Sequence, residues 1–128
     1  MRISITHFAV ESVLGYRQGF FGLIAEGWEI SDTTGKGSRG PLPPETLEVE
    51  TLVGLLDQER GSSAFWTVEE FNDAAALQAS STGHPASRKL SVENLAQVKA
   101  KRSQLFSRWF ALPAGETLQL RFESVSRD

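Results

Sequence analysis

The chain has 128 residues, of which 40% are hydrophobic, and a formal charge of −3. This is enough for one hydrophobic core and too little for two ordinary domains, so residues 1–128 are expected to form a single domain. The absence of cysteine excludes disulfides, thiolate catalysis and metal sites with cysteine ligands. The first residues lack the order of a signal peptide and no apolar run is long enough to span a membrane, so we expect a soluble protein of the cytoplasm.

Two segments alternate polar and apolar residues, as half-buried strands do. The first is Arg2–Thr6, and the second is Thr117–Glu123, which follows a turn signal at Pro113–Gly115. We expect the two ends of the chain to pair in a small antiparallel sheet. Two strands make a marginal sheet, so either a third strand at Trp28–Ser31 or pairing with a second subunit is expected to complete it.

A helix is predicted between Phe8 and Gly27, because apolar side chains recur there at three- and four-residue steps. Gly15, Gly19 and Gly22 recur at the same spacing. Each costs a helix roughly 1 kcal/mol relative to alanine, so we expect close packing to offset that cost. The neighbour is another helix of this chain, the predicted sheet or a second subunit.

Two more helices have recognisable starts. The segment Pro44–Glu59 opens with proline and Glu45, which suit a first helical turn. Thr67 and Glu70 have the spacing of a capping box, in which each side chain binds the other residue's backbone amide. They predict a helix that runs to about residue 80.

The polar segment Ser80–Lys89 is expected to be a mobile surface loop. Ser91 then caps a long last helix, which Pro113 stops. The expected order is therefore strand, four helices, strand, which favours an α+β domain with helices on one face of the sheet.

Residues 35–40, GKGSRG, match the pattern G-x-G-x-x-G of dinucleotide-binding loops. That function needs a helix that begins directly on the glycines, so that its free amides face the pyrophosphate. Here the segment Pro41–Pro44 intervenes, with three prolines that have no N–H. We interpret the segment as a flexible cationic loop in which Lys36 and Arg39 hold a phosphate or carboxylate, touch a partner or lie in solvent.

Arg102 lies near the middle of the apolar face of the last helix, where a charged side chain is unexpected. Arg17 is in the same situation on the first predicted helix. Three outcomes are open for such a charge. The stem covers the core while the guanidinium reaches solvent, an acid such as Glu26, Glu48 or Glu50 pairs with it, or it faces a cavity that holds an anionic ligand.

Other chemistry has little support in the sequence. His7 and His84 lie in different elements without metal-site spacing, and no catalytic residue, metal or cofactor is predicted. The last helix carries both basic and aromatic residues. The aromatic side chains share its apolar face, so we expect them to be buried in the core rather than available to stack on bases. This arrangement and the negative net charge argue against nucleic acid as a partner.

We therefore expect a non-enzymatic interaction or structural module that acts as a homo-oligomer or adaptor. Its candidate interface comprises Gly15, Gly19 and Gly22. The alternative is a small-ligand-binding protein or enzyme for an anionic substrate, a phosphate or a carboxylate. Its candidate ligand-binding residues are Arg102, Arg17, Lys36 and Arg39.

Overall fold

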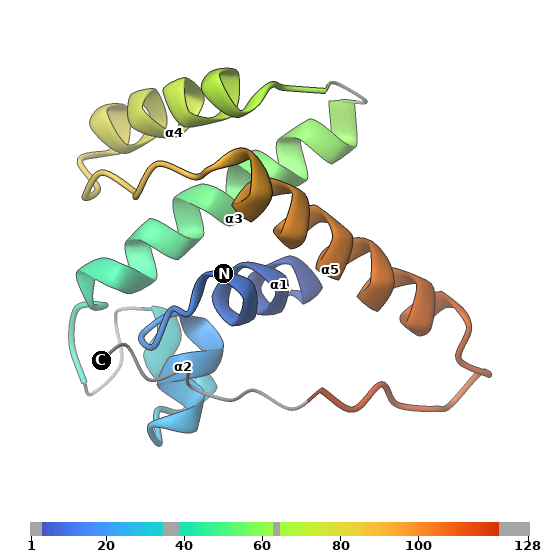
Figure 1. Cartoon of the computed structure of the whole chain (residues 1–128). Helices are drawn as coiled ribbons and strands as arrows, with labels where there is room; N and C mark the ends of the chain where they lie inside the picture. The colour runs from blue at the N-terminus through green and yellow to red at the C-terminus, as the bar shows by residue number, and fades with distance from the viewer. Residues whose placement is uncertain (1–3, 35–38, 63–64, 121–128) are drawn as a thin grey trace.

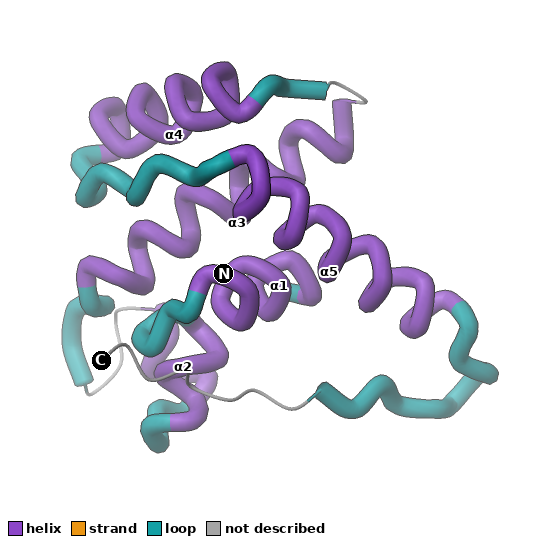
Figure 2. Tube along the Cα trace, in the orientation of Figure 1, coloured by secondary structure: helices purple, strands orange, loops and turns teal. Residues whose placement is uncertain are grey.

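The computed structural model describes residues 4–34, 39–62 and 65–120, and in these residues every regular element is a helix and none is a strand. Figure 2 shows helices joined by loops over the whole described trace. The α+β prediction is therefore wrong. The elements are α1 (Ile5–Leu14), α2 (Phe20–Ala25), the 3-10 helix η1 (Ile30–Thr34), α3 (Pro44–Ser62), α4 (Val68–Thr82) and α5 (Val92–Phe110).

Helix α1 lies at the centre of the arrangement and packs against both α3 and α5 (Figure 1). Helix α4 packs mainly on α3, while α2 packs along α1, with its Phe20 and Phe21 rings against His7 and Phe8, and η1 packs on α2. Most of the buried apolar side chains form one cluster. Its members include Tyr16, Phe20, Leu52, Leu56, Phe71, Leu95 and Val98.

The predicted N-terminal strand is replaced by the start of α1. Ser4 is the N-cap of that helix, and its hydroxyl accepts a hydrogen bond from the amide of His7. The His7 ring accepts in return from the Ser4 amide, at 3.0 Å, which completes a capping box. Alternation over only five residues is compatible with the end of a helix as well as with a strand. Here the capping hydrogen bonds between Ser4 and His7 favour the helix. Arg2 and Ile3 lie outside the described residues.

The predicted C-terminal strand is also wrong for the part that is described. Residues 117–120 are irregular, with Leu118 and Leu120 half-buried on alternate positions, and residues 121–123 lie outside the described part. The Trp28–Ser31 strand is replaced by η1, where the Asp32 carboxylate accepts from the Glu29 amide at 2.9 Å. That side-chain bond holds the backbone in a turn, which a strand cannot accommodate.

The helix expected between Phe8 and Gly27 is broken in two. Gly15 ends α1 in the left-handed conformation, with φ of 72°, and Gly19 begins α2. The connecting residue Tyr16 is buried and donates to Glu48 at 2.6 Å. Gly15 and Gly19 therefore mark helix ends, while Gly22 lies within α2. Their spacing alone could not distinguish this from a stripe along one helix.

The three later helices are confirmed. Helix α3 begins at Pro44 as predicted and runs to Ser62, and the Thr67–Glu70 capping box is present at the start of α4. The Ser91 hydroxyl accepts from the Asn94 amide at the start of α5. None of the described helices combines the length and the apolar character needed to cross a membrane.

Candidate functional site

An open groove of about 510 Å³ lies where the start of α1 meets the ends of α3 and α5. Its walls are mainly apolar, and the Arg60 guanidinium stacks over the Phe106 ring at 4.3 Å from the ring centre. On its floor the Thr6 hydroxyl donates to Asp57 at 2.9 Å, which ties α1 to α3. The lining residues are Ser4, Ile5, Thr6, Asp57, Arg60, Gly61, Phe106, Trp109, Leu118 and Leu120.

Ser4, at the edge of this groove, begins a chain of polar contacts that leads into the protein. Its hydroxyl lies 2.9 Å from Nδ1 of His7, whose Nε2 lies 3.2 Å from Oε2 of Glu50 on α3. Because the Ser4 amide donates to Nδ1, that nitrogen is an acceptor, so the ring carries its proton on Nε2 and donates to Glu50. His7 is only 3% exposed, and its ring packs edge-on against Phe20.

This arrangement was not predicted from the sequence, because a strand places residues 4 and 7 on opposite faces. Helical geometry brings them to the same side. The spacing of Ser4 and His7 was a readable signal, since it is that of a capping box with histidine in place of the usual glutamate or glutamine. The contact with Glu50 joins residues 43 apart in the sequence and had no local signal.

A second feature is an apolar patch at the end of α5, which we call the α5-end patch: Trp109, Phe110, Leu112 and Pro113. Trp109 is 49% and Phe110 73% exposed, although the Phe110 ring stacks on Phe106 at 6.0 Å between ring centres. The turn after α5, together with Trp109 and Phe110, lines an open hollow of about 390 Å³. Arg108 precedes the patch in the sequence and Glu116 follows it; both are exposed, so one charge of each sign flanks the patch along the chain.

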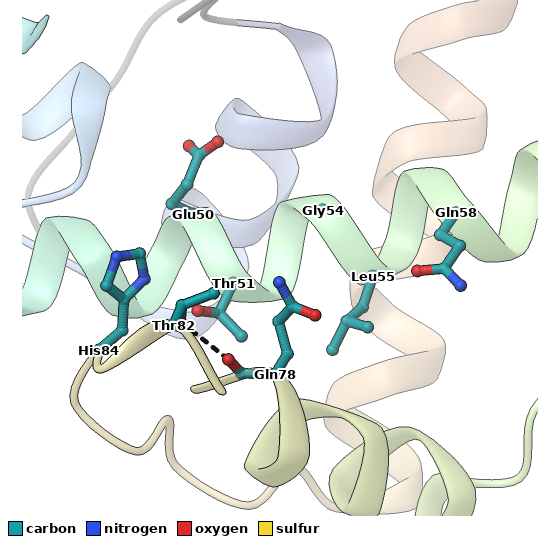
Figure 3. Close-up of a pocket in the computed structure, with 8 residues that line it drawn as sticks. All are labelled: Glu50, Thr51, Gly54, Leu55, Gln58, Gln78, Thr82 and His84. Carbon is teal, nitrogen blue, oxygen red and sulfur yellow. Dashed lines mark hydrogen bonds between the residues drawn. The ribbon is translucent and has the colours of Figure 1, made fainter. Parts of the chain in front are cut away.

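A smaller polar pocket of about 220 Å³ lies between α3 and α4. Figure 3 shows Gln78 and Thr82 of α4 close to Thr51 and Leu55 of α3, with His84 near one end. Both threonine hydroxyls already donate to carbonyl oxygens of their own helices, at 2.8 and 3.3 Å. The other lining residues are Glu50, Gly54 and Gln58, so the pocket has no cationic side chain.

Among the described residues, the cations proposed from the sequence lie in separate places. Nη1 of Arg102 donates to the carbonyl oxygen of Leu56 at 3.1 Å, which none of the three expected outcomes included. Burial lowers the pKa of Arg102, and the negative charge of Asp57 opposes that shift. Arg17 is exposed, and its amide donates to Glu45 at 2.6 Å. The partners of Arg102 and Arg17 are about 16 Å apart along α3.

The cationic loop is described only in part, and Lys36 lies outside the described residues. Arg39 lies over the Trp28 ring, at 5.2 Å from its centre, and donates to the carbonyl oxygen of Gly27 at 3.3 Å. Its Nε is 3.8 Å from the Asp32 carboxylate. Arg39 therefore binds to η1 and the turn before it, and anion binding by the four cations stays a prediction.

Gly19 and Gly22 are buried inside the chain. A side chain at Gly22 would collide with the backbone carbonyl of Arg17, and one at Gly19 with the side chain of Glu11. The close packing that we expected at these glycines is therefore made by α1 and the turn that follows it. An interface with a second subunit at Gly15, Gly19 and Gly22 stays a prediction.

Glu11 is the most unusual charged group in the core. It is 0% exposed, and its carboxylate accepts from the amides of Phe21 and Gly22 at the start of α2, at 3.2 and 3.0 Å. Burial raises the pKa of Glu11 to about 7, although these amides and the nearby His7 act in the opposite direction. The carboxyl group thus joins α1 to α2.

Comparison with models of protein families, with curated proteins and with solved structures finds no match to the chain. In the described residues no three His, Asp or Glu side chains come together in a way that could hold a metal ion. The candidate sites are therefore judged on their own geometry. They are the groove with Ser4, the α5-end patch and the pocket between α3 and α4.

Proposed function

We propose that the protein is an interaction module that self-associates through the α5-end patch. The observation that carries this proposal is the exposure of two neighbouring aromatic rings, Trp109 and Phe110, at the end of a helix. Exposed aromatic residues in a contiguous patch are typical of protein interfaces, where their burial supplies much of the binding energy. The cytoplasm is the proposed location, because a chain without cysteine needs no oxidising compartment.

A second copy of the chain is the proposed occupant, because the patch is complementary to itself. It holds protruding rings and, beside them, a hollow of about 390 Å³. In a twofold-symmetric dimer the ring of each copy enters the hollow of the other. The same symmetry can bring Arg108 of one copy near Glu116 of the other, so the charges at the edge attract rather than repel.

Sedimentation equilibrium of three proteins tests the proposal: the wild type, Phe110→Ser, and Leu77→Ser as a matched control. Leu77 lies on α4 and is 72% exposed, close to the 73% of Phe110. We expect a dimer for the wild type and for Leu77→Ser, and a monomer for Phe110→Ser. A wild type that stays monomeric at all concentrations, or a dimer unaffected by Phe110→Ser, would contradict self-association through this patch.

A further inference from the structure

We propose that Ser4, His7 and Glu50 form a hydrolytic site that cleaves small apolar carboxylic esters bound in the neighbouring groove. The proposal does not rest on self-association, although Trp109 belongs both to this groove and to the α5-end patch. It rests on a serine hydroxyl at the edge of a mainly apolar groove, hydrogen-bonded to a buried imidazole that is itself bound to a carboxylate. A nucleophile, a base and a group that orients the base are the parts that acyl transfer through serine requires.

The hydrogen-bond pattern gives each group a suitable protonation state. The Nδ1 atom of His7 is an acceptor that both the Ser4 amide, at 3.0 Å, and the Ser4 hydroxyl oxygen, at 2.9 Å, can approach. To take the proton of the hydroxyl, its lone pair must turn from the amide to the hydroxyl. The opposite nitrogen donates to Glu50 at 3.2 Å, which fixes the ring and stabilises the imidazolium that forms. Burial of His7 at 3% exposure and its edge contact with Phe20 hold the ring in place.

The position of Ser4 at the start of α1 supplies a site for the developing negative charge. Helix geometry leaves the amides of Ile5 and Thr6 without an acceptor inside the helix, and their dipoles favour negative charge there. The His7 amide, 3.4 Å from the Ser4 oxygen, also favours charge on that oxygen. A carbonyl oxygen of a bound ester can therefore be stabilised next to the nucleophile.

The groove fits an uncharged acyl chain. Its volume of about 510 Å³ is within the range of small-molecule sites, and its apolar walls include Ile5, Phe106 and Leu118. Asp57 and Arg60 are its charged lining residues, one of each sign. They give no net preference for a charged substrate, so we expect a neutral ester.

The reaction has two balanced steps. The Ser4 oxygen attacks the carbonyl carbon while its proton passes to Nδ1 of His7, the ester C–O bond breaks, and the same proton passes to the leaving alkoxide. The products of this step are the alcohol and acyl-Ser4. Water then attacks the acyl carbon and gives a proton to Nδ1 of His7. The bond from the acyl carbon to the Ser4 oxygen breaks and His7 passes that proton to the oxygen, which releases the carboxylic acid and restores the serine hydroxyl and the neutral histidine.

The capping box explains the contact of Ser4 with His7, but it requires neither the contact of His7 with Glu50 nor a groove beside Ser4. Two variants separate capping from catalysis. Ser4→Asp keeps an N-cap residue and removes the nucleophile, while His7→Gln keeps a capping-box residue and removes the base. Both are therefore expected to fold, which thermal unfolding checks.

The experiment measures hydrolysis of p-nitrophenyl butyrate and labelling by a fluorophosphonate, with the labelled residue located by mass spectrometry. We expect the wild type to be labelled on Ser4, and both variants to lose hydrolysis by about 100-fold or more. Ser91→Asp is the matched control, because Ser91 also caps a helix, and it should behave as the wild type. No labelling of Ser4, or wild-type hydrolysis in either folded variant, would overturn the proposal.

Glu50 acts through His7 and is a positioning residue. Glu50→Gln should lower kcat at least tenfold and leave KM unchanged, because it weakens the orientation of the base without touching the groove. Equal kcat values in the variant and the wild type would show that Glu50 does not position His7 for the reaction.

Discussion

The carboxylate of Glu11 accepts a hydrogen bond from the amide of Gly22 at 3.0 Å inside the core. One buried acid thus holds the start of α2 against the last part of α1, and no side-chain cation is hydrogen-bonded to it among the described residues. The hydrogen bonds from the backbone amides replace only part of the hydration that the Glu11 carboxylate loses. Burial therefore has the largest effect on the pKa of Glu11 and raises it.

This contact predicts a pH-dependent stability. Burial raises the pKa of Glu11 from 4.5 to about 7, so the folded state holds a proton that the unfolded chain releases. The stabilisation is fully present below pH 4.5 and is lost as the pH rises through 7, at a cost of about 3 kcal/mol. Glu11→Gln should lack this loss. Urea unfolding of both proteins between pH 4.5 and 8 measures the difference, and parallel pH profiles would contradict a raised pKa.

Glycine substitutions should have opposite effects at two positions. Gly22→Ala places a methyl group against the backbone carbonyl of Arg17, so we expect a loss of about 1–3 kcal/mol in the free energy of unfolding. Gly54→Ala, in the middle of α3, meets open space and should stabilise the protein by about 1 kcal/mol through helix propensity. Denaturant unfolding measures both, and an equal gain for the two variants would show that α2 does not pack closely on the preceding turn.

Arg102 is expected to act within the fold. Because it donates to the Leu56 carbonyl at 3.1 Å, Arg102→Gln should lower the free energy of unfolding by about 1 kcal/mol. Millimolar phosphate or small organic acids should leave the melting temperature of the wild type unchanged. A saturable rise in that temperature, absent from Arg102→Gln, would instead support the anionic-ligand alternative.

The later helices could be predicted because their signals are local. Thr67 with Glu70, and Ser91 before the apolar periodicity of α5, each bind backbone amides within three residues. The ends of the chain could not be assigned in this way. The five alternating residues Arg2–Thr6 fit both a strand and the start of a helix. The decisive feature is the side chain of His7, which completes the capping box with Ser4.

The candidate sites were less predictable, because they depend on contacts between distant elements. Glu11 was unremarkable in the sequence, since its partner amides reach it only after the chain turns between Gly15 and Gly19. Glu50 was considered as a partner for Arg102 and is found beside His7 instead. The exposure of Trp109 and Phe110 was also unexpected, because their spacing with leucines predicted core positions.

Hydrogen–deuterium exchange at two protein concentrations tests self-association through the α5-end patch most directly, because it reports both whether the chains associate and where. At the higher concentration the account predicts slower exchange in the backbone amides of residues 108–116 and unchanged exchange around Leu77 on α4. Phe110→Ser should abolish the difference. Equal exchange of residues 108–116 at both concentrations, when sedimentation shows monomers at the lower and dimers at the higher concentration, would contradict the account.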